Sequence, residues 1–147
     1  MSAATRVLFV CTHNAARSQM AEGLLRALGG DRFEAASAGT VATRLHPFAV
    51  QAMAEEGIDI ALYESKTVDR YLDESFDVVI TLCDDAAEEC PAFPNAHDRR
   101  HWSFPDPSTA VGSDERRFAV FTAVRDAIRE RIERELIDAE VETREPA

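Results

Sequence analysis

The sequence predicts an α/β fold, a three-layer sandwich in which a four-stranded parallel sheet carries helices on both faces. The first observation is an alternation along the chain. Short apolar runs rich in β-branched and aromatic residues alternate with longer segments whose apolar residues recur every three or four positions. The second is size, because 147 residues, 46% of them hydrophobic, suffice for one domain with a real core. Alternating strands and helices are typical of parallel sheets, whose two faces need helices to cover them.

Each element is expected from a local pattern. Strands are expected at residues 7–10, 33–37, 76–82 and 99–104, of which the first and third are apolar runs rich in β-branched residues. Helices are expected from Ser18 to the pair Gly29 and Gly30, from Pro47 to Gly57, over about residues 114–136, and, as a short one, over 67–72. The long helix has a core-facing stripe that consists of Phe118, Phe121, Val124, Ile128, Ile132 and Leu136. Residues 1–147 are predicted to form a single domain with a frayed acidic tail from about residue 139.

Composition excludes several classes of protein. The net charge of −11 argues against a nucleic-acid ligand, which requires a basic face. No segment approaches the ~20 apolar residues that span a bilayer, and the first apolar run is too short for a signal peptide, so we expect a cytoplasmic chain without membrane contact. An acidic protein repels anions as a whole, and an oxyanion site must therefore be built locally from backbone N–H groups and a few cations.

The segment after the first strand has the composition of an anion-binding loop with a nucleophile. Cys11 and Arg17 are separated by five residues, and a helix follows. Small residues let the backbone N–H groups turn inward, the helix contributes its positive end, and Arg17 adds a fork for two oxygens. These features favour the thiolate form of Cys11, to which Ser18 can donate. We call residues 11–18 the anion loop. Its predicted oxyanion-binding residues are Thr12, His13, Asn14, Ala15, Ala16, Arg17 and Ser18.

Asp106 is a candidate general acid, because the prolines on either side of it fix the backbone and aim its carboxyl group. An ordinary Asp-Pro turn is the alternative, and it is common in proteins. The four histidines are expected to have surface or packing roles, including His13 inside the loop and His46 before the second helix.

Two further thiols follow the third predicted strand. Cys83 and Cys90 lie seven residues apart, which on an intact helix is about 10.5 Å along the axis, too far for a disulfide. The pair can bond only if the segment loops out, and its acidic residues and Pro91 favour that. An odd number of cysteines does not suit a structural disulfide framework. Inert thiols, or a zinc site that recruits His97 and His101, are the alternatives.

The anion loop, followed by Gln19-Met20-Ala21-Glu22-Gly23, resembles that of the low-molecular-weight protein tyrosine phosphatases. That resemblance implies a four-stranded parallel sheet and a catalytic Asp before proline, here Asp106. The segments Cys11-Thr12-His13-Asn14, Thr81-Leu82-Cys83, Glu89-Cys90-Pro91 and His101-Trp102 resemble more narrowly the thioredoxin-coupled arsenate reductases, over nearly the whole chain.

This resemblance implies the chemistry. Cys11 would attack arsenic while Arg17 and the loop hold the oxyanion, and Asp106 would protonate the leaving oxygen. Cys83 and Cys90 would complete a thiol–disulfide relay that thioredoxin resets, with thioredoxin reductase and NADPH behind it. The implied role is arsenic detoxification by a monomer without a tightly bound cofactor or metal.

One position departs from the resemblance. Some relatives hold a potassium ion behind the anion loop with residues matching Asn14, Glu22 and Ser37 and an acidic residue whose place here is taken by Lys66. A lysine ammonium could fill that space and pair with Glu22, so we expect little or no potassium dependence. The alternative is that Lys66 is merely exposed.

Two rival functions stay open. A phosphatase would use Cys11, Arg17 and Asp106 alone, although Ser108-Thr109-Ala110 after the Asp-Pro pair offers no aromatic group to grip a tyrosine ring. A redox or anion sensor would use the same thiols without turnover. Steady-state arsenite release separates an enzyme from a sensor, and activity on an aryl phosphate separates the two enzymes.

Overall fold

The fold is a four-stranded parallel sheet with helices packed on it, as predicted. The structure is a computed structural model and describes residues 4–82 and 96–138. The strands β1 (Thr5–Cys11), β2 (Phe33–Gly39), β3 (Phe76–Thr81) and β4 (Ala96–His101) lie in the order β2-β1-β3-β4, and every pair is parallel. The carboxyl ends of all four strands therefore meet at one edge of the sheet, where ligands bind in open α/β folds.

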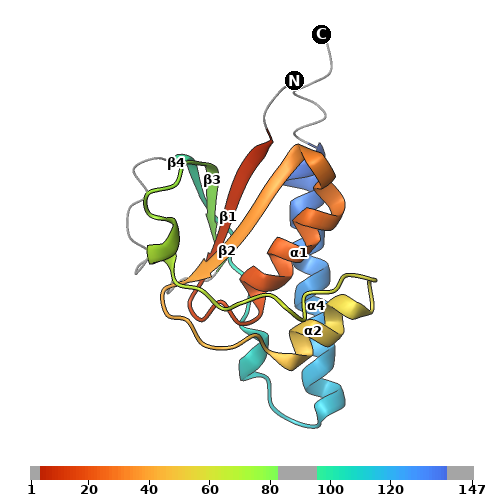
Figure 1. Cartoon of the computed structure of the whole chain (residues 1–147). Helices are drawn as coiled ribbons and strands as arrows, with labels where there is room; N and C mark the ends of the chain where they lie inside the picture. The colour runs from red at the N-terminus through yellow and green to blue at the C-terminus, as the bar shows by residue number, and fades with distance from the viewer. Residues whose placement is uncertain (1–3, 83–95, 139–147) are drawn as a thin grey trace.

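Three helices cover one side of the sheet in Figure 1. They are α1 (Arg17–Gly29), α2 (Pro47–Ala54) and α4 (Asp114–Ile132), and α1 contacts both β1 and β2. The short 3₁₀ segment η2 (Val68–Tyr71) lies on the opposite side (Figure 1). Residues 7–10 of the central strand are all fully buried, which means that both faces of the sheet are covered there. Both faces being covered explains why this strand reads as one continuous apolar run.

The core stripe predicted for the last helix is present. Phe121, Val124, Ile128, Ile132 and Leu136 are buried, and Phe118 packs against the same core while partly exposed. The helix ends at Ile132 in α-geometry and continues through a π-helical turn, Glu133–Ile137, which brings Leu136 into the core. No helix in the part of the chain that the structure describes is long and apolar enough to cross a membrane.

Several predicted boundaries were wrong. The last strand was expected over residues 99–104 but spans Ala96–His101, an edge strand with mostly exposed charged residues. Trp102 and Phe104, which the prediction included, follow the strand and are buried. The short helix over 67–72 is a 3₁₀ segment, and α2 ends at Ala54, with a turn to Gly57 at φ 72°. The predictions for residues 83–95 and for the tail from 139 lie outside the described residues.

Candidate functional site

Cys11 is the last residue of β1 and lies buried at the floor of the anion loop, with 2% of its surface exposed. Its Sγ is 2.8 Å from the hydroxyl oxygen of Ser18. The same oxygen accepts a hydrogen bond from Asn14 Nδ2, also at 2.8 Å. Because Ser18 accepts from Asn14, its own proton is available for the sulfur. The loop therefore supplies a donor to the nucleophile before any substrate arrives.

The loop is fixed from outside through its carbonyl oxygens. Every carbonyl from residue 12 to residue 15 accepts a hydrogen bond: Thr12 O from Val41 N (3.0 Å), His13 O from Thr43 Oγ1 (3.1 Å) and Ser65 Oγ (3.0 Å), Asn14 O from Gln19 Nε2 (3.1 Å), and Ala15 O from His46 N (2.9 Å). None of the described peptide bonds is cis. In a trans peptide the C=O and N–H point in opposite directions. The outward carbonyls therefore turn the N–H groups of the following residues toward the inside of the loop.

Helix α1 adds its positive end to this ring of donors. Its N-cap is Ala16, whose side chain makes no capping hydrogen bond, so the positive end of the helix dipole adjoins the loop. Arg17, the first residue of the helix, is buried, and its guanidinium donates to the carbonyl of Phe104 at 3.1 Å. A second Arg17 nitrogen lies 3.6 Å from the carboxylate of Asp106. The predicted cation and the predicted acid thus share one side of the loop.

Asp106 is held by the residue that follows its proline. Its Oδ1 accepts from the backbone N–H of Ser108 at 2.9 Å and from the Ser108 hydroxyl at 2.7 Å. Partial burial raises the pKa of this carboxyl, but the two Ser108 bonds and the charges of Arg17 and His13 outweigh it and leave the pKa below its usual value. Asp106 is therefore ionised at neutral pH.

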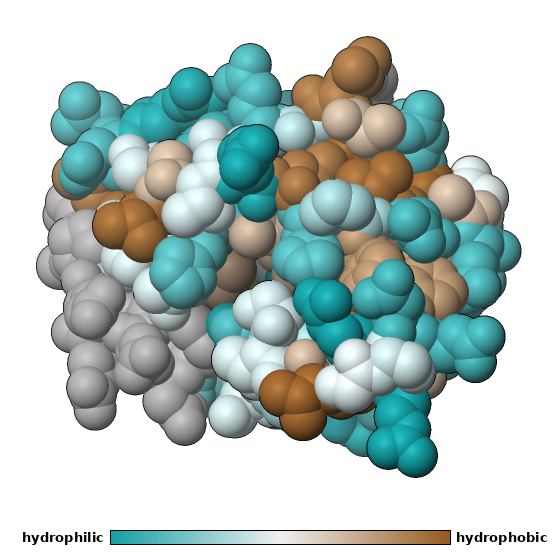
Figure 2. Space-filling model, turned by 90° about the horizontal axis from the view of Figure 1, so that it is seen from below, coloured by the Kyte–Doolittle hydropathy of each residue, from teal (hydrophilic) through white to brown (hydrophobic). Residues whose placement is uncertain are grey.

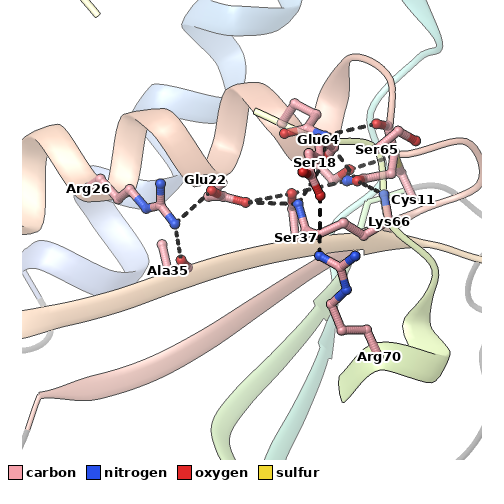
Figure 3. Close-up of polar contacts among 12 residues, drawn as sticks. Cys11, Ser18, Glu22, Arg26, Ala35, Ser37, Glu64, Ser65, Lys66 and Arg70 are labelled. Carbon is pink, nitrogen blue, oxygen red and sulfur yellow. Dashed lines mark hydrogen bonds and ion pairs between the residues drawn. The ribbon is translucent and has the colours of Figure 1, made fainter. Parts of the chain in front are cut away.

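A buried polar network supports the loop from behind, as Figure 3 shows. Asn14, in the left-handed region at φ 50°, donates to Ser37 Oγ at 3.0 Å. Ser37 in turn donates to Glu22 at 2.7 Å, and the second oxygen of Glu22 meets Arg26 at 2.9 Å. The backbone N–H of Lys66 donates to Asn14 Oδ1 at 2.8 Å. Because both polar atoms of the Asn14 side chain are used, the loop conformation depends on this residue.

Lys66 is buried beside Glu22, which excludes the alternative of an exposed surface lysine. Its ammonium lies 3.9 Å from a Glu22 oxygen and donates to the carbonyl of Glu64 at 2.8 Å. Burial lowers the pKa of Lys66, and the charge of Glu22 partly offsets this effect. The predicted pairing of Lys66 with Glu22 is thus present in the fold.

The site faces the end of the molecule at which the strands finish, the view given in Figure 2. That face is mainly hydrophilic, and its hydrophobic areas form separate patches. A mainly hydrophilic surface at this end of the molecule suits a small polar anion better than a large apolar group.

The family model of the low molecular weight phosphotyrosine protein phosphatases matches residues 6–145. The chain belongs to this family. Within it, the chain is 48% identical over 126 residues to the arsenate reductase of Halalkalibacterium halodurans and 45% identical over 126 residues to that of Bacillus subtilis, in each case over 86% of this chain and 91% of the relative. A solved arsenate reductase in a phosphate-binding state aligns with a TM-score of 0.78 at 34% identity, covering 91% of this chain and 98% of the other.

The phosphatase-family fold accounts for the residues that sequence analysis placed together. Cys11, Arg17, Ser18 and Asp106 do converge on one loop. Cys83 and Cys90 lie outside the described residues, although Leu82, which precedes Cys83, bonds to Val10 through its N–H at 2.8 Å. The residues that support the loop from outside were not predicted from the sequence; they are Val41, Thr43, Ser65 and the backbone of His46.

The buried pair of Lys66 and Glu22 predicts the response of this family member to monovalent cations. The Lys66 ammonium already occupies the space beside one Glu22 oxygen, and Arg26 pairs with the other, so a free ion adds nothing at that place. The activity of this chain is expected to be the same in sodium and potassium salts of equal ionic strength. The steady-state rate in the two salts measures this, and strong activation by potassium would contradict the pairing. In a Lys66→Met variant, whose Glu22 has lost this partner, we expect a rate that depends on the cation.

Proposed function

We propose that this chain is an arsenate reductase that uses Cys11, Cys83 and Cys90 in turn and is reset by thioredoxin. The observation that carries the proposal is the buried Cys11 inside a loop whose carbonyls are all held outward, beside Arg17. The names of the relatives support arsenate as the anion. Arsenate is a tetrahedral anion close to phosphate in size, and arsenic(V), unlike phosphorus(V), accepts two electrons from thiols.

The first step is substitution at arsenic. Cys11 sulfur forms a bond to arsenic, an As–O bond breaks, and that oxygen leaves as water. Arg17 and the inward N–H groups hold the remaining oxygens. Because Asp106 is ionised at neutral pH, it must first take the proton of a protonated arsenate and then pass it to the leaving oxygen.

The second step is the reduction itself. Cys83 thiolate attacks the sulfur of Cys11, the S–As bond breaks, and its electron pair stays on arsenic, which leaves as arsenite. A Cys11–Cys83 disulfide remains. Cys90 then attacks Cys83 and frees Cys11, and the dithiol of thioredoxin reduces the resulting Cys83–Cys90 disulfide. A monomer in the reducing cytoplasm, with thioredoxin reductase and NADPH behind it, is part of the same proposal.

A coupled assay tests this function. The protein, arsenate, thioredoxin, thioredoxin reductase and NADPH are mixed, and NADPH consumption and arsenite are both followed. We expect one NADPH per arsenite over many turnovers, and neither signal when Cys11 is replaced by Ser. Hydrolysis of an aryl phosphate without NADPH consumption would instead favour the phosphatase alternative, and binding of arsenate without turnover would favour a sensor.

A further inference from the structure

His46 lies between helix α2 and the anion loop and makes a hydrogen bond to each. Its backbone N–H donates to the carbonyl of Ala15 at 2.9 Å, and its ring Nδ1 accepts from the N–H of Phe48 at 3.1 Å. We propose that His46 is a positioning residue that holds the anion loop in its binding shape while its ring is neutral and loosens it when the ring is protonated. This inference rests on the oxyanion site of the proposed function.

The backbone of His46 acts on the loop directly. The Ala15 carbonyl shares its peptide plane with the N–H of Ala16, so the bond to His46 sets the direction of that N–H. Ala16 is the N-cap of α1 and directly precedes Arg17, which makes this peptide the junction between the loop and the helix. A shift of His46 therefore turns a donor at the centre of the oxyanion site.

The ring of His46 fixes the position of that backbone. His46 is the N-cap of α2, at φ −74° and ψ 132°, and its ring occupies the place that Asn, Asp or Ser usually takes. Nδ1 can accept from Phe48 only if it carries no proton, and the ring proton must then be on Nε2. Protonation of Nδ1 places a donor against a donor and removes the cap.

The surroundings keep the ring neutral. It packs against Phe121 of α4 with the ring centres 4.5 Å apart, and against Phe48 at 5.5 Å. Burial lowers the pKa of His46, Arg117 of α4 lowers it further, and Asp106 raises it. A protonated ring would also attract the Asp106 carboxylate, which now lies by Arg17, and protonation would disturb both sides of the anion site.

The lowered pKa of His46 decides on which side of neutrality its contribution is lost. The pKa of His46 is lower in the folded than in the unfolded chain, so the unfolded chain binds its proton first as the pH falls. The contribution of His46 is complete above the unfolded value of 6.5 and is lost as the pH falls through the folded value. Weakened anion binding is therefore expected on the acid side.

The experiment measures phosphate binding by calorimetry from pH 5 to pH 8, together with the His46 Cε1–H resonance by NMR. His46→Asn keeps a capping oxygen and does not titrate, whereas His46→Ala loses the cap. The ratio of wild-type to His46→Asn dissociation constants cancels the titrations of phosphate, Cys11 and Asp106. We expect a ratio near one at pH 8 and a wild-type affinity about fivefold weaker once the pH lies below the folded pKa of His46, which the resonance measures; fivefold is the value of one lost cap. His46→Ala is expected to bind about fivefold more weakly at pH 8.

His97→Asn is the matched control, because His97 is an exposed histidine on β4, and its ratio to wild type is expected to be independent of pH. A ratio for His46→Asn that stays flat while the His46 resonance titrates would overturn the proposal, as would a resonance that does not titrate between pH 5 and pH 8, or wild-type affinity in folded His46→Ala at pH 8. Phosphate binding requires no reduction, so the two proposals can fail separately. If the coupled assay shows no arsenate reduction but phosphate binding depends on pH as expected, the proposed function is rejected and the role of His46 is retained.

Discussion

A Cys90→Ser variant is expected to produce about one equivalent of arsenite per chain and then to stop, with thioredoxin as the sole reductant. In the proposed relay Cys90 is the only group that attacks Cys83 and frees Cys11. Without it the chain stays in the Cys11–Cys83 disulfide. Cys11 is 2% exposed beneath the anion loop, where another protein cannot reach its sulfur. Because Cys11 is buried, the disulfide must be passed to Cys83 and Cys90 before thioredoxin can reduce it.

Rapid-quench measurement of arsenite and peptide mapping of the stalled chain check this result. The map should contain the Cys11–Cys83 disulfide and no bond from either residue to thioredoxin. Cys83→Ser is the matched variant, which should bind arsenate but release little arsenite, since no thiol remains to attack Cys11. Sustained turnover by Cys90→Ser would show that thioredoxin reduces the inner disulfide directly, and the relay would have to be abandoned.

The sequence predicted the inside of the site well, because those residues lie close together along the chain. Cys11, Arg17 and Ser18 fall within one strand–loop–helix unit, whose local geometry is set by short-range sterics and the helix end. Lys66 and Glu22 were also paired correctly, but only through the resemblance to relatives. No local pattern indicates that residues 44 positions apart meet.

The residues that support the loop from outside could not be predicted, because they lie far from it along the chain. Thr12 is held by Val41, and His13 by Ser65, which is 52 residues away. These bonds use backbone N–H groups and short hydroxyls, which every segment offers, so composition carries no signal for them. His46 was given a surface or packing role, and its ring does pack, but the bond that matters leaves from its backbone.

Polar residues in two other places carry no local signal of the position they take in the fold. The β4 sequence Ala-His-Asp-Arg-Arg-His shows no apolar alternation because an edge strand is paired on one side only and faces solvent. Arg125 is charged and would be read as a surface residue of α4, yet it is buried. It donates to the carbonyl of Ala52 at 2.8 Å and to Glu55 at 2.9 Å, and so closes the C-terminal end of α2. Arg125 is buried because α4 packs against the end of α2, which the residues around Arg125 in the sequence do not indicate.

A Gly39→Ala substitution is expected to deform the anion loop and reduce kcat/KM for arsenate by about a hundredfold or more, the cost of losing one oxyanion donor. Gly39 ends β2 beside Cys11. A Cβ there would lie 2.6 Å from the carbonyl oxygen of Val41, 2.7 Å from that of Thr12 and 2.8 Å from the backbone nitrogen of Asn14. All three are backbone atoms, which cannot move aside as a flexible side chain does, and two of them belong to the loop.

The free energy of unfolding of Gly39→Ala is expected to fall by about 3 kcal/mol, at the upper end of the usual cost of overpacking. Phosphate affinity, measured on the folded fraction, should also fall, because the Thr12 carbonyl can no longer accept its hydrogen bond from the Val41 N–H. Gly57→Ala is the matched control. Its Cβ would meet open space, and only its φ of 72° is unfavourable, so it should cost about 1 kcal/mol in stability and leave phosphate affinity unchanged. If Gly39→Ala loses stability but binds phosphate like the wild type, the outward carbonyls are not what shapes the loop.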